Sequence, residues 1–100
     1  MVEDILQELR SRSTNLRSLN ASVRFVFEKE KQVVRVDART DPVSITQQDA
    51  ESDCTIRISP DNLAKLINGR LNPTLAFTMG KLKVEGSMSI AMKLAQLFDE

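Results

Sequence analysis

The stretch that decides the fold is residues 80–94, GKLKVEGSMSIAMKL, because its pattern changes at Gly86. Before Gly86, Leu82 and Val84 alternate with charged residues, which predicts a strand with one buried face. After it the alternation stops and apolar side chains dominate as far as Phe98. We therefore expect a short strand over 81–86, followed by a helix over 88–98.

The expected last helix is apolar around most of its circumference. A helical wheel places its polar residues in one narrow stripe, made of Ser89, Lys93, Gln96 and Glu100. Such a helix must be covered on more than one side, and a chain of this length has few elements to cover it. Two explanations remain open. Residues such as Met88 and Met92 are simply core, or they face a ligand, a partner chain or a membrane surface.

An enclosed empty space behind this helix would be costly. Cavities cost about 24 cal/mol per Å³, so a lipid-sized void of ~400 Å³ would cost ~10 kcal/mol, about the stability of a typical domain. Such a space would be filled, open to solvent or collapsed. Methionine suits a site that accepts varied apolar ligands, because its side chain is flexible and polarisable.

Two helix starts precede this stretch. Ser59 and Asn72 are each followed by proline. Serine and asparagine side chains cap helix N-termini, and proline suits the first helical position, where an N–H would have no partner within the helix. The first helix carries an apolar stripe and stops near Gly69, and the second is a short turn that ends before Gly80.

Alternating apolar and polar residues predict further strands over 21–27, 32–38 and 53–59. The polar turn EKEK lies between the first two, which should form an antiparallel hairpin. Val43 and Ile45 suggest a short additional strand, and the polar residues after it read as a loop.

The N-terminal residues predict an amphipathic helix, with apolar side chains at helical spacing at Val2, Ile5, Leu6 and Leu9. The pattern weakens over 11–15, so Leu16 and Leu19 either continue the helix or belong to a packed connector that ends near Asn20. In sum, we expect one α+β domain over residues 1–100. Its five-stranded, mainly antiparallel sheet would have one polar face in water and helices on the other.

Composition excludes several classes of function. Fourteen basic and fourteen acidic residues cancel, so no overall field attracts nucleic acid. The chain has no histidine, which removes imidazole catalysis and the commonest metal ligand. Its single cysteine, Cys54, forms no internal disulfide and is expected to be a buried structural thiol in a reducing, cytoplasmic setting. No apolar run is long enough to cross a bilayer.

Residues 53–97 resemble the sterol carrier protein type-2 domain, the nonspecific lipid-transfer family. DCTIRIS, LINGRLNP and AFTMGKLKVEGSMSIAMKL follow the order of that family's strand, helix and closing helix. The most specific features are Asn72-Pro73, the turn GKLK over 80–83, Gly86 two residues before Met88, and AMKL over 91–94. The first half of the chain matches in the order of elements alone.

The resemblance implies a hydrophobic cavity between sheet and helices that binds a sterol, a fatty acid, a fatty acyl-CoA or a phospholipid acyl chain. It implies no chemistry on the ligand, and therefore no enzyme, no cofactor and no metal. Carried over to this chain, the cavity would be lined by Phe25, Phe27, Ile56, Ile58, Leu66, Phe77, Met79, Leu82, Val84, Met88, Met92 and Leu94.

The chain ends in FDE and not in the peroxisomal tripeptide of eukaryotic members, so we expect a small prokaryotic-type, stand-alone member. Sterol is then in doubt as the physiological ligand. We expect a monomer rather than a homodimer, at most transient contact with a membrane surface, and a solvated sheet face at Arg35, Arg57, Lys81 and Lys83. The alternative is an interaction module that docks through the apolar last helix onto a partner or a second copy.

Overall fold

The computed structural model describes residues 2–98 and contains five strands and five α-helices in that range. The helices are α1 (Val2–Ser11), α2 (Ser13–Leu16), α3 (Pro60–Ile67), α4 (Pro73–Thr78) and α5 (Met88–Phe98), with a 3₁₀ turn, η1 (Arg17–Leu19), after α2. The strands are β1 (Ser22–Phe27), β2 (Gln32–Asp37), β3 (Ser44–Thr46), β4 (Cys54–Ile58) and β5 (Leu82–Gly86).

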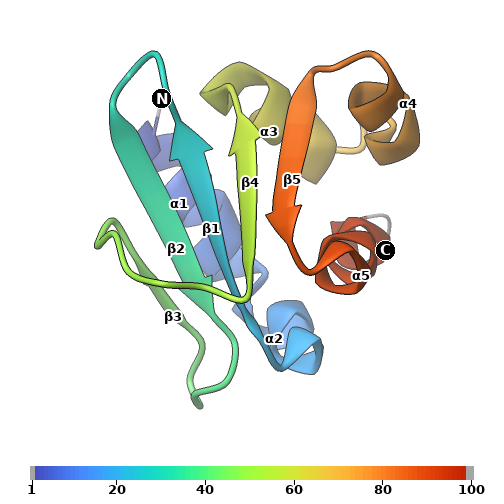
Figure 1. Ribbon diagram of the computed structural model, residues 1–100. Coiled ribbons are helices and arrows are strands. Elements are labelled where there is room, and N and C mark those ends of the chain that lie inside the picture. Colours follow the sequence, from blue (N-terminus) through green and yellow to red (C-terminus); the bar gives the residue numbers. More distant parts are fainter. Residues whose placement is uncertain (1, 99–100) are drawn as a thin grey trace.

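The strands form one sheet in the order β3-β2-β1-β4-β5 (Figure 1). Three of the neighbouring pairs are antiparallel, including the β1–β2 hairpin, and β1 and β4 run parallel. The α+β fold with a mainly antiparallel sheet is therefore confirmed, and so is the short strand at Ile45.

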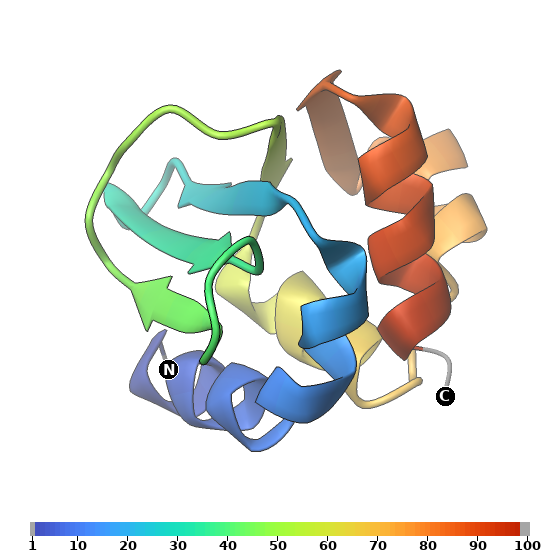
Figure 2. The same cartoon turned by 90° about the horizontal axis from the view of Figure 1, so that it is seen from below.

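Helices cover one face of this sheet. In Figure 1, α1 and α3 lie behind the strands, while α4 and α5 stand beside β5. Figure 2 shows the helices on one side and the β3–β4 connection on the other. The hydrophobic core lies between the sheet and α1, α2 and α3, where alternate strand residues such as Phe25, Phe27 and Val34 are fully buried.

The weakened pattern after residue 10 marks a real break in the first helix. A second short helix and a 3₁₀ turn follow α1, and Asn20 ends the turn in the left-handed conformation at φ 49°. Leu16 and Leu19 are buried in the core. These residues therefore form the packed connector and do not continue α1.

Both predicted helix starts are confirmed. The Ser59 Oγ accepts a hydrogen bond from the Asn62 N–H at 3.1 Å, and proline fills the next position. The Asn72 Oδ1 accepts from the N–H groups of Thr74 and Leu75, at 2.9 and 3.1 Å. These caps fix where α3 and α4 begin, and for α3 also the direction in which it leaves β4.

The outer face of the sheet differs from the expectation of a polar face in water. Because β3 is an edge strand and β4 lies beyond β1, their connection has to cross the outer face (Figure 1). Arg35 holds this loop through the Ser52 Oγ at 3.0 Å and the Glu51 carbonyl at 2.8 Å, and Arg24 pairs with Asp49 at 2.7 Å. Thr55 faces outward and is nevertheless buried.

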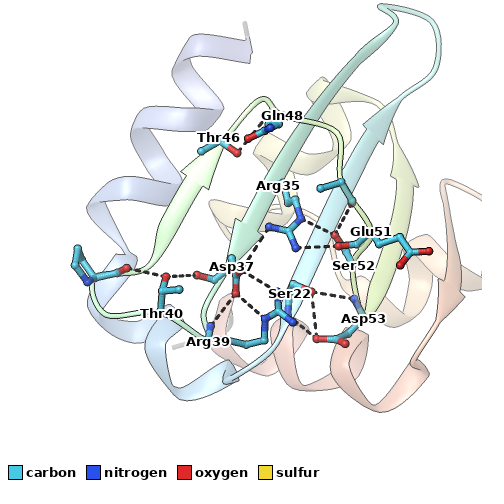
Figure 3. Close-up of polar contacts among 12 residues, drawn as sticks. Ser22, Arg35, Asp37, Arg39, Thr40, Thr46, Gln48, Glu51, Ser52 and Asp53 are labelled. Carbon is cyan, nitrogen blue, oxygen red and sulfur yellow. Dashed lines mark hydrogen bonds and ion pairs between the residues drawn. The ribbon is translucent and has the colours of Figure 1, made fainter.

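Polar contacts also lie at the end of β2 and where the loop enters β4 (Figure 3). Asp37 accepts hydrogen bonds from Arg39 at 2.9 and 3.0 Å, which hold the pKa of its carboxyl far below the usual range. Asp53 Oδ2 accepts from the Ser22 N–H and Oγ at 2.9 and 3.1 Å, and the Ser22 Oγ in turn accepts from the Asp53 N–H at 3.0 Å. The bond from the Ser22 N–H is the main reason why the pKa of Asp53 is also lowered.

Candidate functional site

A row of apolar side chains crosses the inner face of the sheet and forms the floor of a cavity. Phe25 on β1 pairs with Ile56 on β4, and Ile56 pairs with Val84 on β5, so the three lie side by side. Leu82 lies two residues before Val84 on the same face of β5. The period-two pattern of the sequence thus places four apolar residues on one surface.

Helices α3, α4 and α5 form the walls. The cavity has a volume of about 350 Å³, and Thr74 is the one polar residue among those that line it. The complete lining is Phe25, Ile56, Leu63, Leu66, Pro73, Thr74, Phe77, Leu82, Val84, Met88, Ala91, Met92, Leu94, Ala95 and Phe98.

The cavity opens to solvent beside α4 and α5. Phe77, Met88 and Met92 line it and are nevertheless 47%, 44% and 61% exposed, so they mark its mouth. Of the three states that the energy of an empty cavity allows, the structure therefore shows the open one. Ala91 and Ala95 lie between these larger residues and leave the space unfilled, because their side chains end at Cβ.

The junction between β5 and α5 directs α5 toward the cavity. Gly86 has a φ of +86°, and a Cβ at this position would lie 2.7 Å from the Asp53 carbonyl oxygen. The same oxygen accepts a hydrogen bond from the Ser87 N–H at 3.0 Å, and the Ser87 Oγ accepts from the Ile90 N–H at 3.3 Å. Asp53 therefore binds the start of α5 through its carbonyl oxygen and the start of β1 through its side chain.

The structure places nine of the twelve predicted residues at the cavity and three elsewhere. Phe27 and Ile58 do not line it. They are buried in the core, at the end of the sheet where β4 leads into α3. Met79 follows the last residue of α4 and is 63% exposed, away from the cavity lining. Its place among the expected lining residues came from the family resemblance alone.

Six lining residues were not predicted: Leu63, Pro73, Thr74, Ala91, Ala95 and Phe98. Helical spacing could have found four of them, because Phe98 follows the predicted Leu94 by four residues on α5. Leu63 precedes Leu66 by one turn, and Ala91 and Ala95 fall at i+3 and i+7 from Met88. Pro73 and Thr74 gave no such indication, because their role depends on where the capped α4 sits over the sheet.

The apolar character of α5 has a structural reason. Besides the cavity, α5 contacts β4, β5, α2, α3 and η1, so most of its circumference faces protein or the cavity. Leu94 and Phe98 are buried, while Ser89, Lys93 and Gln96 form the exposed polar stripe. The predicted fourth member of this stripe, Glu100, lies outside the described residues.

The single thiol of the chain lies in an apolar environment. Cys54 is fully buried on the inner face, and burial raises the pKa of its thiol to about 11. Its expected role as a structural thiol fits this environment. Within residues 2–98 no three acidic, cysteine or histidine side chains are placed to hold a metal ion.

A sheet covered by helices, with an apolar cavity between them, defines an α+β domain suited to binding an apolar ligand. The SCP-2 sterol transfer family model matches residues 2–99, and the chain therefore belongs to this family of lipid-binding and lipid-transfer domains. No helix in the described range is long and apolar enough to span a membrane.

Individual relatives support this assignment. Sterol carrier protein 2 of Oryctolagus cuniculus is 45% identical over 53 residues, which are 53% of this chain and 10% of that protein. The solution structure of the sterol carrier protein domain 2 of Helicoverpa armigera matches with a TM-score of 0.73 and 30% identity, covering 96% of this chain and 81% of that one. The palmitated SCP2L2 of Aedes aegypti shares the fold, at a TM-score of 0.63 and 18% identity over 80% of this chain and 73% of that one.

Proposed function

We propose that this protein is a non-enzymatic lipid carrier whose cavity holds the apolar part of one lipid. The observation that carries the proposal is the open cavity with a single polar lining residue, Thr74. Burial of an acyl chain is favourable by about 0.8 kcal/mol per methylene. Ten buried methylenes then give about 8 kcal/mol, which corresponds to a dissociation constant on the order of micromolar.

The polar end of the lipid stays at the mouth. A carboxylate inside the cavity would lose its hydration, and the lining offers only the Thr74 hydroxyl in return. A fatty acid, an acyl-CoA or a phospholipid chain can meet this requirement, because its polar end lies at one terminus. We place the fatty acid first, since one neighbour of the same fold was solved in a palmitated form. A sterol remains a second candidate.

We also propose that the ligand is carried unchanged. Attack on a lipid needs a nucleophile or a general base within hydrogen-bond reach of the reacting atom. The cavity lining has no ionisable side chain. The protein would then act as a monomeric cytoplasmic carrier, and turnover of a lipid by the isolated protein would overturn this part of the proposal.

Two measurements test the carrier function. Native mass spectrometry after gentle purification shows whether a lipid is retained, and titration with a fluorescent fatty acid, with palmitate, palmitoyl-CoA and cholesterol as competitors, ranks the ligands. Met92→Asp should weaken fatty-acid binding at least tenfold, because it places a carboxylate at the mouth of an apolar site. Met79→Asp is the matched control, since Met79 is equally exposed but does not line the cavity.

A thermal melt of both variants separates lost binding from lost folding. The proposal fails if the wild-type chain retains no lipid and binds none of the four ligands. It also fails if the two aspartate variants bind fatty acid equally well. An interaction module would instead give a ligand-free dimer in sedimentation velocity.

A further inference from the structure

A second hollow adjoins the cavity at the opposite end of α4 and α5 from the mouth. The mouth lies at Phe77, near the end of α4, and at Met88 and Met92 in the first half of α5. The second hollow has a volume of about 420 Å³ and lies at the start of α4 and the last turn of α5. Four residues line both spaces: Leu66, Pro73, Ala95 and Phe98.

The boundary between the two spaces contains small side chains. Pro73 on α4 and Ala95 on α5 are each partly buried, and the Ala95 side chain ends at Cβ. Arg70 and Asn72 line the second hollow alone and are exposed. An acyl chain that passed between Pro73 and Ala95 would therefore lead from the cavity to solvent, and we call this place the second opening.

The two openings offer a lipid different chemistry. The exposed side chains that mark the mouth are a phenylalanine and two methionines. At the second opening lies Arg70, the one ionisable residue among the described residues that line either space. Asn72 uses its Oδ1 to accept the N–H groups that begin α4, so its amide NH₂ group remains a donor. A negatively charged group therefore meets a cation at the second opening and none in the lining of the mouth.

Two helix caps hold the backbone around Arg70, in the connection that runs beside the end of α5 in Figure 2. Gly69 lies just beyond α3 at a φ of +73°, and its N–H donates to the Leu66 carbonyl at 3.2 Å. The Arg70 N–H donates to the Lys65 carbonyl at 2.8 Å, which completes the glycine cap of a helix C-terminus. The Asn72 cap then begins α4. The backbone from which the Arg70 side chain starts is therefore fixed, while the exposed side chain can turn toward a ligand.

The acidic residues of the chain bear on whether Arg70 is available to a ligand. Within residues 2–98 Arg70 forms no ion pair, and none of the described residues that line the two spaces is acidic. Asp99 and Glu100 follow Phe98 in the sequence and lie outside the described residues. Their carboxylates are therefore neutralised in one arm of the experiment, which distinguishes a contact with the ligand from an ion pair within the chain.

We propose that Arg70 binds the carboxylate of a fatty acid at the second opening, while the acyl chain passes between Pro73 and Ala95 into the cavity. This inference rests on the proposed carrier function and refines it, because it moves the polar end of the lipid from the mouth to the second opening. The methyl end of the chain then points toward the mouth. A guanidinium suits this role, since its planar array of N–H donors matches the two oxygens of a carboxylate. The carboxylate also stays hydrated, as the apolar lining of the cavity requires.

Isothermal titration calorimetry with laurate and with dodecan-1-ol tests this contact, because the two ligands have the same chain length and differ in charge. Arg70→Gln should weaken laurate binding about fivefold, the upper value for an exposed ion pair, and leave dodecanol binding unchanged. Arg70→Lys keeps the charge and should recover part of the lost affinity. At about 1 M salt, where charges are screened within ~3 Å, the wild-type and Arg70→Gln chains should bind laurate equally.

Two further variants make the test specific. Lys93→Gln removes the same charge beside the mouth, because Lys93 follows Met92 on α5 and lines neither space. It should leave laurate binding unchanged. In the background D99N/E100Q, where neither residue can form an ion pair with Arg70, Arg70→Gln should still weaken laurate binding about fivefold.

Equal laurate affinities of the wild-type and Arg70→Gln chains at low salt would overturn the inference. So would an equal weakening of laurate and dodecanol binding, or an effect of Arg70→Gln that disappears in the D99N/E100Q background. Weaker laurate binding by Lys93→Gln alone would place the carboxylate at the mouth. All of these results leave the carrier function intact, since the wild-type chain still binds lipid, whereas a wild-type chain that binds neither ligand would count against the carrier function itself.

Discussion

At the scale of single residues, Asp53 and Gly86 fix the geometry on which the cavity depends. Asp53 binds Ser22 through its side chain and Ser87 through its carbonyl oxygen, so one residue joins β1, β4 and the start of α5. The backbone of Gly86 lies so close to this carbonyl oxygen that a Cβ atom has no room there. The direction of α5, and with it the width of the cavity, is therefore set at this crossing.

Gly86→Ala should reduce the free energy of unfolding by about 2–4 kcal/mol. A positive φ alone costs an L-residue about 1–2 kcal/mol, and here the new Cβ also meets the Asp53 oxygen at 2.7 Å. Gly80→Ala is the control, because Gly80 has a similar φ of +74° but open space around it. Urea denaturation compares the two variants. Equal losses of unfolding free energy in the two variants would show that contact with the Asp53 oxygen does not destabilise Gly86→Ala.

The low pKa of Asp37 makes stability depend on acid pH. Its folded pKa lies below its unfolded value of about 3.9, so its contribution is complete above about pH 4 and is lost as pH falls toward the folded pKa. Asp37→Asn should cost about 1–3 kcal/mol at neutral pH, and its deficit relative to the wild type should shrink below about pH 4. Urea titrations across this range measure the difference, and a deficit independent of pH would exclude the ionic contribution.

At the scale of elements, sequence patterns predicted the parts that depend on local physics. The period of two placed Phe25, Ile56 and Val84 on one face, and the capping residues located the starts of α3 and α4. The patterns could not show that the β3–β4 connection crosses the outer face, because that follows from strand order. Strand order depends on contacts between residues far apart in the chain.

The same limit explains why the predicted site residues and the residues that line the cavity differ. Met79 and Met92 were both expected to line the cavity, yet Met79 lies outside its lining and Met92 marks its mouth. Ala91 and Ala95 were not predicted, because the expected lining consisted of large apolar side chains alone. A cavity also needs small residues, which leave the space that large ones enclose.

At the scale of the whole molecule, the open cavity couples ligand binding to stability. A ligand that binds only the folded state stabilises it by about 2.7 kcal/mol at a hundred times its dissociation constant. In a domain of this size, each kcal/mol raises the melting temperature by about 4–8 °C. Saturating palmitate should therefore raise the melting temperature of the wild-type chain by roughly 10–20 °C.

Ala91→Leu tests whether this shift arises in the cavity. Ala91 lines the cavity on α5 and is partly buried, so a leucine there adds methyl groups to the space that the acyl chain would occupy. Filling a cavity commonly stabilises a protein by about 0.5–2 kcal/mol, so the variant without ligand should melt at or above the wild-type temperature. The rise in its melting temperature with palmitate should be much smaller, because the leucine side chain occupies the space that the acyl chain needs. A variant that keeps the full shift would place the palmitate elsewhere on the molecule.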